Sequence, residues 1–507
     1  MKFVNFNEKG IPMLSKLNTI PLNFHQSIDN IDDYDAIITI IDHEENLSDQ
    51  PYAEALLHRY RRMKEVIAAH QEGKNKKSKH EAWSTVLPNK LGSKQIIVNN
   101  IKGKDVVKWL KKLSNCLSDI KIKDCQKIAL NLVNSDDKTA QEALRVLLAH
   151  LQNMPNYSQN HKPVQVEIDV IGDYYESDFI DVLAKHTGNA LARYLTILPS
   201  NYLTPEIYIE ALEQLAHEQG WAYDYFDKKD LQEMGAGAFS AVARASDMAG
   251  IVKLSYKAAN ACKLITLVGK GVCFDTGGVS LKQPQYMEGM NDDMMGSAVA
   301  LGSFAALSML QVPYDINCYL AITRNNIGEH AFVPNEVVTA LNGKTIEVID
   351  TDAEGRMILA DTLVLASREK PDILIDFATL TGAAVRALGT QYSAIFSNHY
   401  DWYAKLIECG IESGEKVWPF PMDNSFMEGL KSDIADLKQC AVIGNADHIL
   451  AAKFLQQFVD KNIRWLHVDL ASCKNKNGLG AIPTEVTGVG VWFAIEALNG
   501  LPDQKEN

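Results

Sequence analysis

The chain has 507 residues, which is too long for a single hydrophobic core and predicts at least two domains. Its 64 acidic residues outnumber its 50 lysines and arginines, and the net charge of −14 argues against a nucleic-acid partner. No apolar stretch approaches the roughly 20 residues of a membrane span, and no hydrophobic signal segment opens the chain, so we expect a cytoplasmic protein without a membrane partner.

The N-terminal third has the pattern of a separate α/β unit. Residues 36–41 and 95–98 are short apolar runs typical of buried strands, and residues 53–69 and 139–151 have helical periodicity. A basic run at 74–79 is the one candidate for nucleic-acid contact, but the acidic character of the whole chain favours a solvated loop. This third carries no recognisable catalytic motif.

The C-terminal two thirds alternate apolar strands with helical stretches. The strand-like runs are 264–268, 316–322, 373–377 and 465–470. This alternation predicts a mostly parallel central sheet flanked by helices, with a site at the ends of the strands. We therefore predict an α/β fold with a smaller N-terminal α/β domain over 1–172, which has no catalytic motif, and a C-terminal domain over 173–507 that carries the site.

A glycine-rich segment over 269–282 follows the first of these strands and is interpreted as a loop that lets a ligand approach the backbone. Lys270 follows the buried strand directly, so its amine is expected to be desolvated. Beside two cations this amine would lose its proton and donate a lone pair to a metal. Further along, Asp292 and Asp293 precede an alanine-rich helix, and each taken singly is more typical of a helix cap than of a ligand.

Residues 350–356 carry the most informative pattern of the chain, with Asp350, Asp352 and Glu354 at every second position. In an extended segment this spacing puts the three carboxylates on one face, where a divalent metal would neutralise them. A short acidic run is usually a solvated turn, but this one lies between an apolar strand-like run at 345–349 and an apolar helical pattern from 357. The pattern therefore predicts a metal site.

Together these segments resemble the leucyl aminopeptidase (cytosol aminopeptidase) family, peptidase family M17. The resemblance runs from residue 190 to residue 498. It is carried by Asp-Thr-Asp-Ala-Glu-Gly-Arg at 350–356, where the family has Asn-Thr-Asp-Ala-Glu-Gly-Arg, and by the glycine-rich lysine segment at 269–282. Shorter matches lie at 199–205, 376–383, 432–438 and 465–471.

Carried onto this chain, the resemblance implies a two-metal aminopeptidase. It assigns five ligands to two divalent ions: Lys270, Asp275, Asp293, Asp352 and Glu354. Of these, Asp275 and Glu354 would bridge the ions. This oxygen-rich shell suits Mn²⁺, Zn²⁺ or Mg²⁺ without selecting among them, and it needs no cysteine or histidine.

The resemblance also implies how peptides are cleaved and by what assembly. A hydroxide shared by the ions would attack the first peptide bond, protonated Lys282 would stabilise the oxyanion, and Arg356 would hold a bicarbonate that shuttles the proton. Met290, Thr379 and Gly382 would line the pocket for a leucine-like or methionine-like first residue. Taken alone, Lys282 and Arg356 also fit structural ion pairs, and Met290 also fits core packing. The family assembles as a homohexamer, so a homohexamer is implied here.

Four positions depart from the family pattern without removing a ligand: Asp350, Met295, Ser297 and Ser472. Asp350 adds a negative charge beside the metals, and we expect it to tighten metal binding or to raise the pKa of a neighbouring carboxyl group. The other three are expected to reshape the substrate pocket. Two rival functions stay open. A two-metal phosphoesterase would use a similar carboxylate cluster but normally adds histidine ligands, and a non-enzymatic DNA-binding role would require a basic surface.

Overall fold

The computed structural model describes residues 19–41, 82–86, 94–99, 106–133, 135–442 and 445–502. The predicted helix over 53–69, the basic run at 74–79 and the opening residues of the chain lie outside these ranges. The described residues divide into two compact units. One runs up to His186 and includes Asn477–Thr484, and the other comprises Thr187–Lys476 and the segment from Glu485 onward. The predicted domain boundary after residue 172 stays a prediction, because this division does not test which segments fold alone.

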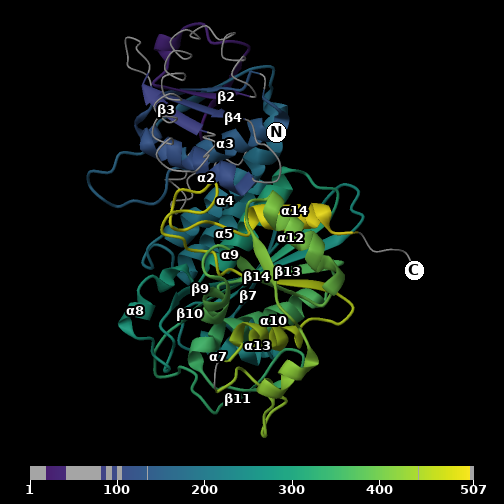
Figure 1. Ribbon diagram of the computed structural model, residues 1–507. Coiled ribbons are helices and arrows are strands. Elements are labelled where there is room, and N and C mark those ends of the chain that lie inside the picture. The colour runs from purple at the N-terminus through teal and green to yellow at the C-terminus, as the bar shows by residue number, and fades with distance from the viewer. Residues whose placement is uncertain are drawn as a thin grey trace, which may run out of the picture. The chain divides into compact units, whose positions relative to one another are not determined.

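The smaller unit is built around a six-stranded sheet (Figure 1). Its strand order is β1-β6-β5-β2-β4-β3, and only the β3–β4 pair is antiparallel. The strands are β1 (Leu22–His25), β2 (Ala36–Ile41), β3 (Ala82–Val86), β4 (Lys94–Asn99), β5 (Lys127–Asn131) and β6 (Glu167–Ile171). Helices α2 (Val106–Asp119) and α3 (Asp137–Leu151) contribute buried apolar residues to its core. The strands predicted at 36–41 and 95–98 and the helix predicted at 139–151 are confirmed.

Helix α3 begins where its sequence provides a cap. The carboxylate of Asp136 accepts a hydrogen bond from the backbone N–H of Thr139 at 2.9 Å, which satisfies one of the free donors of the first turn. Eleven of its residues are buried, from Thr139 to Leu151. The helix is therefore held both by its cap and by its burial in the core.

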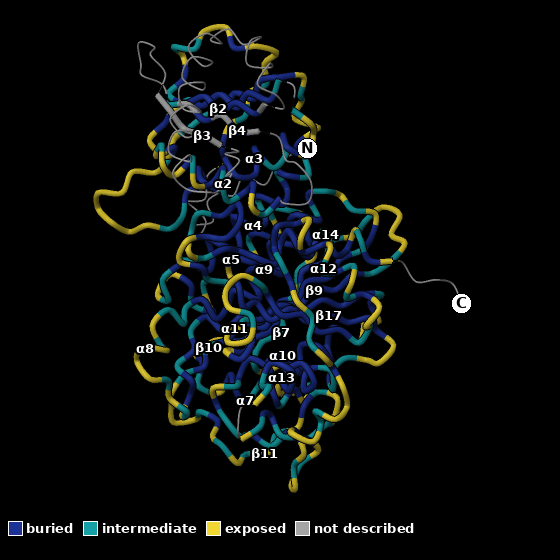
Figure 2. Tube along the Cα trace, viewed as in Figure 1, coloured by how far each residue is buried: buried dark blue, intermediate teal, exposed yellow. Residues whose placement is uncertain are grey.

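The larger unit has an eight-stranded, mostly parallel sheet that confirms the predicted α/β architecture. Its order is β15-β14-β17-β13-β9-β10-β8-β7. The central strands β17, β13, β9 and β10 run parallel, whereas β8 and β7 join one edge antiparallel. The bounds are β7 (Ala222–Asp227), β8 (Gly250–Tyr256), β9 (Leu264–Asp275), β10 (Asp315–Asn325), β13 (Ile373–Ala378), β14 (Ser393–Ser397), β15 (Val417–Pro419) and β17 (Arg464–Asp469). Figure 2 shows the centre of this unit as buried.

Helices α9 (Met295–Met309) and α10 (Glu354–Ser367) cover opposite faces of the central strands. A side chain at Gly269 would come within 2.4 Å of the Cα of Ser297 on α9, whereas the neighbouring Lys270 reaches Gly355 on α10. Because successive residues of a strand point to opposite faces, the two helices lie on different sides of β9. Both helices are buried almost throughout, as their apolar sequences require.

The interpretation of 269–282 as a loop is wrong for its first half, because β9 continues to Asp275. The parallel strand β10 pairs with this stretch as far as Asp275, whereas the pairing of β13 with β9 ends at Gly269. The glycine at 269 is explained by the close approach of α9 and not by a turn. The turn comes later, at Gly277 and Gly278, whose φ values of +86° and +67° favour glycine.

The extended geometry predicted for 350–356 is also wrong. The strand β12 (Thr345–Glu347) ends early, Thr351–Ala353 forms a 3-10 turn, and α10 starts at Glu354. The side chain of Asp350 accepts a hydrogen bond from the N–H of Asp352 at 3.0 Å and so promotes the turn. The three carboxylates therefore do not share one face of a strand.

None of the helices in the described ranges is long and apolar enough to cross a membrane.

Candidate metal centre

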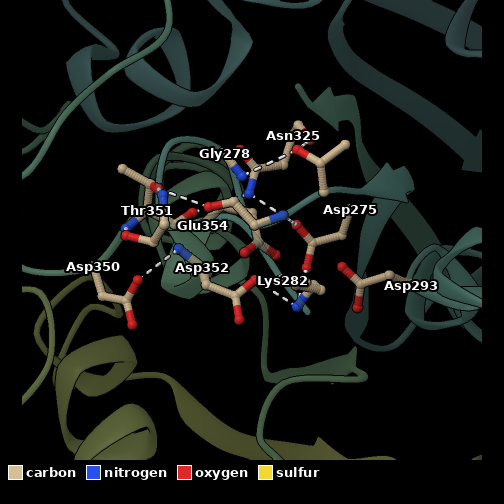
Figure 3. A network of polar contacts seen from close by, with 12 residues as sticks. Asp275, Gly278, Lys282, Asp293, Asn325, Asp350, Thr351, Asp352 and Glu354 are labelled. Carbon is tan, nitrogen blue, oxygen red and sulfur yellow. Dashed lines mark hydrogen bonds and ion pairs between the residues drawn. The ribbon is translucent and has the colours of Figure 1, made fainter. Parts of the chain in front are cut away.

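Three carboxylates from three different elements converge at the end of the central strands. Asp275 is the last residue of β9, Asp293 precedes α9, and Glu354 is the first residue of α10. Carboxylate oxygens of the three lie within 4.8 Å of one another, and all three residues are buried. Figure 3 shows their side chains in one cluster. The structure thus brings together three of the five residues predicted as ligands, although they are far apart in sequence.

The other two predicted ligands flank this cluster. Lys270 places its Nζ 2.8 Å from a carboxylate oxygen of Asp293 and 2.9 Å from one of Glu354. Asp352 lies beside Lys282, whose Nζ is 2.5 Å from Asp352 and 2.8 Å from Asp275 (Figure 3). The predicted structural ion pair of Lys282 with the acidic cluster is therefore present, which does not exclude a role in chemistry.

The packing of these carboxylates makes their ionisation costly. Burial, together with the charges of Asp275 and Glu354, raises the pKa of Asp352 to about 7. Burial also raises the pKa of Asp293 and of Glu354, and neighbouring carboxylates add to the effect. Burial alone would lower the pKa of Lys270, but the charges of Asp293, Glu354 and Asp275 raise it above its ordinary value. The site is thus short of positive charge.

Two buried carboxylate oxygens also indicate that the site lacks positive charge. In the described part of the chain, neither Oδ2 of Asp293 nor Oε2 of Glu354 has a hydrogen-bond partner. A buried carboxylate oxygen without a donor is costly, because the desolvation of its charge is not compensated. Oxygen atoms of this kind are the ligands that Mn²⁺ and Mg²⁺ prefer and that Zn²⁺ also accepts. The residues present therefore fit divalent cations.

A second layer of hydrogen bonds orients the cluster. Asn325, the last residue of β10, donates from Nδ2 to Asp275 at 2.8 Å and to the carbonyl of Thr351 at 2.9 Å. The hydroxyl of Thr379 donates to Asp293 at 2.8 Å. Asn325 was not among the predicted site residues, although its place at the end of the parallel strand next to Asp275 was a usable signal.

The cluster opens into a cavity of about 710 Å³. The three residues predicted to form the substrate pocket, Met290, Thr379 and Gly382, all line it. Of the four departures from the family pattern, only Asp350 lines this cavity. Met295, Ser297 and Ser472 are buried and do not line the cavity, so their expected effect on the substrate pocket stays a prediction.

Arg356 also lines this cavity, but its guanidinium group pairs with Asp447, which was not among the predicted site residues. Its Nη2 lies 3.0 Å and 3.2 Å from the two carboxylate oxygens of Asp447, and its Nη1 donates to the carbonyl of Gln439 at 3.3 Å. Asp447 begins helix α13 (Asp447–Gln456) and follows Arg356 by 91 residues in a segment without a recognised motif. No local pattern indicated this contact.

A known protein family matches the part of the chain that carries the carboxylate cluster. The catalytic-domain model of the cytosol aminopeptidase family matches residues 190–495. The chain belongs to this family. A probable cytosol aminopeptidase of Prochlorococcus marinus is 39% identical over 367 residues, which cover 71% of this chain and 75% of that protein. The protein is therefore an aminopeptidase, a hydrolase of the metal-dependent M17 family.

Solved structures share the architecture over nearly the whole chain. A mutant of tomato leucine aminopeptidase has a TM-score of 0.79 at 26% identity, covering 95% of this chain and 97% of that one. A bottromycin maturation enzyme in complex with Mn has a TM-score of 0.75 at 26% identity, covering 92% of this chain and 98% of that one. These likenesses agree with the α/β fold described above.

Proposed function

We propose that this aminopeptidase binds two divalent ions through Lys270, Asp275, Asp293, Asp352 and Glu354 and releases N-terminal leucine-like or methionine-like residues from peptides. The observation that carries the proposal is the buried group of Asp275, Asp293 and Glu354, with two oxygens that no hydrogen bond satisfies. The described carboxylate group contains no histidine, which favours this function over a two-metal phosphoesterase.

The proposed ion arrangement follows from which residues are neighbours. Asp275 lies between the two groups of contacts, since it belongs to the triad with Asp293 and Glu354 and also shares Lys282 with Asp352. This position supports Asp275 and Glu354 as bridging ligands, with Asp352 serving the second ion. The donor set admits Mn²⁺, Zn²⁺ or Mg²⁺. The Mn complex of the bottromycin maturation enzyme supports manganese as the first ion to test.

When bound, the two ions would supply an activated water and polarise the scissile carbonyl. The chain itself supplies Lys282, whose amine lies beside Asp275 and Asp352. Burial opposes its charge, but Asp275 and Asp352 outweigh this and raise the pKa of Lys282 above its ordinary value. A permanently protonated amine is suited to stabilising an oxyanion in a largely buried site.

The proposed substrate pocket is set by Met290, Thr379 and Gly382. Methionine is apolar and adaptable, so Met290 suits unbranched or γ-branched side chains. A side chain in place of Gly382 would crowd Arg386, whose Nη1 would lie 3.3 Å from its Cβ, so glycine keeps this part of the cavity lining small. These features support a preference for leucine or methionine at the first position.

Bicarbonate does not enter the proposed function. The family resemblance predicts it on Arg356, but the guanidinium of this residue already pairs with the carboxylate of Asp447. The residues present therefore do not fit a second anion.

The proposal includes a homohexamer located in the cytoplasm that acts on peptides and on neither membranes nor nucleic acid. The names of the curated relatives, probable cytosol aminopeptidases, support this location. Light scattering on the purified protein would test the assembly, and a mass far below six subunits would refute it.

Hydrolysis of leucine p-nitroanilide tests the proposed activity. We expect turnover that a chelator abolishes and added Mn²⁺ or Zn²⁺ restores, with methionine p-nitroanilide cleaved comparably and aspartate p-nitroanilide cleaved poorly. Bis(p-nitrophenyl) phosphate serves as the control for a phosphoesterase. Turnover of leucine p-nitroanilide that survives complete metal removal would contradict the proposal, as would faster cleavage of the phosphodiester.

A further inference from the structure

The guanidinium group of Arg356 can bind an anion, and a carboxylate of the same chain, that of Asp447, already occupies it. The exposed fraction of Arg356 is only 2%, and Nη2 contacts both oxygens of the Asp447 carboxylate. Hydrogen bonds between a guanidinium group and a carboxylate are charge-assisted and roughly twice as strong as neutral ones. Unlike Lys282, which pairs with Asp275 and Asp352, Arg356 pairs with Asp447, which is not a proposed metal ligand.

The remaining donors of Arg356 do not provide a second anion site. Nη1 donates to the carbonyl of Gln439. Nε has no partner among the described residues, but it is buried. An anion arriving from the cavity would have to displace the Asp447 carboxylate or share one cation with it. Two like charges at one cation repel each other.

Asp447 is held in this position by its own segment. It is the first residue of α13, where the free N–H groups of the helix favour a negative charge. Ala446 just before it has φ +55°, a left-handed conformation that alanine rarely adopts. Such strain persists only where the surrounding structure imposes it. The side chain of Asp447 is 25% exposed and lines the same cavity as the carboxylate cluster.

We propose that Asp447 is the resident anion of the Arg356 site, so that this aminopeptidase neither binds nor requires external bicarbonate. The inference deepens the proposed function and rests on it only for its activity assay. Asp447 is a positioning residue, since its carboxylate pairs with Arg356 and not with a proposed metal ligand.

Two measurements on the wild-type protein test the proposal without any substitution. Equilibrium dialysis against ¹⁴C-bicarbonate should detect no bound ion, both in metal-free protein and in protein loaded with Zn²⁺. Hydrolysis of leucine p-nitroanilide in buffer freed of carbon dioxide should equal that in buffer with added bicarbonate. One bound bicarbonate per subunit, or a several-fold stimulation of turnover, would overturn the proposal.

Substitutions sharpen the test. Asp447→Ala should open the site, bind about one bicarbonate per subunit and, without bicarbonate, lose on the order of 100-fold in turnover, the lower end of the usual proton-transfer contribution. Added bicarbonate should restore this loss, and the double variant Asp447→Ala with Arg356→Ala should no longer bind the ion. Asp447→Asn keeps the size of the side chain and guards against misfolding of the alanine variant. Glu428→Ala, which removes an exposed carboxylate paired with Lys431, is the matched control and should behave as wild type.

The outcomes separate this inference from the proposed function. If no variant hydrolyses leucine p-nitroanilide, the proposed function fails, while bicarbonate binding by Asp447→Ala and not by wild type would still uphold the inference. If wild type is active but Asp447→Ala binds no bicarbonate and shows no rescue, the inference fails and the function stands.

Discussion

Gly355 leaves the space in which the amine of Lys270 lies, so Gly355→Ala tests the geometry of the site directly. A Cβ at this position would lie 2.6 Å from both Cε and Nζ of Lys270 and 2.8 Å from its Cδ. Ordinary contact between such atoms is about 3.5–4.0 Å, so the lysine must move by about 1 Å. Its Nζ is fixed by Asp293, Glu354 and the carbonyl of Thr379, at 2.8, 2.9 and 3.0 Å.

The consequences for stability and for activity should differ. Alanine is favoured over glycine within a helix by about 1 kcal/mol, whereas overpacking a core costs about 1–3 kcal/mol, so the net loss of stability should stay near or below about 2 kcal/mol. A proposed metal ligand displaced by about 1 Å should lower kcat/KM by on the order of 100-fold and weaken metal binding.

The assay compares Mn²⁺ affinity, kcat/KM for leucine p-nitroanilide and the free energy of unfolding in urea. Gly328→Ala is the control, because its Cβ would make only an ordinary contact of 3.4 Å with Ala245. A Gly355→Ala protein that keeps both Mn²⁺ affinity and kcat/KM within about threefold of wild type would refute the placement of Lys270 in the metal site.

Three further predictions address charge, pH and local stability. Lys282→Met should lower kcat by on the order of 10²–10³-fold while leaving KM nearly unchanged, because its ammonium is proposed to act on the transition state. Steady-state kinetics would measure this loss, and a Lys282→Met protein with the kcat of wild type would contradict the proposed role. Because the pKa of Asp352 is raised to about 7, protons compete with metal for this carboxylate below that pH. Isothermal titration should therefore show that Mn²⁺ affinity rises from pH 5 to pH 7 and that binding releases protons. A pH-independent affinity would contradict this prediction. Asp136→Ala removes the cap of α3 and should cost about 1 kcal/mol in thermal unfolding of the smaller unit without changing kcat/KM.

The linkage of Asp352 to stability has a definite sign in the metal-free protein. Its pKa is raised on folding, so its contribution to stability is complete below its ordinary pKa of 3.8 and is lost as pH rises through about 7. Bound cations should reverse this loss, because they bind the ionised form in the folded state only. Thermal unfolding with and without Mn²⁺ at pH 5 and pH 8 would show the larger stabilisation at pH 8.

The fold was predictable where a local pattern decides the structure. The apolar runs at 316–322 and 373–377 became β10 and β13, and the apolar stretch from Met357 became part of the buried helix α10. The prediction of a loop at 269–282 was wrong for its first half, because glycine serves two different structural purposes in this segment. At Gly269 it allows a helix to approach a strand, and at Gly277 it allows a turn, and only the tertiary structure distinguishes these.

The site was predictable only through motifs. The resemblance named Asp275, Asp293 and Glu354 together, and the structure places their oxygens within 4.8 Å of one another. Residue spacing alone predicted an extended segment at 350–356, which is wrong because the backbone turns at Thr351. The contact of Asp447 with Arg356 could not be predicted, because it spans 91 residues and leaves no periodic or compositional trace.

The central claim is that the buried carboxylate group holds the ions that drive peptide hydrolysis. The most direct test measures bound metal and turnover of leucine p-nitroanilide together, in wild type and in Glu354→Ala loaded with Mn²⁺. The account predicts two ions per subunit and metal-dependent turnover in wild type, with loss of bound metal and of turnover in Glu354→Ala. A Glu354→Ala protein that keeps two ions and wild-type turnover would contradict it.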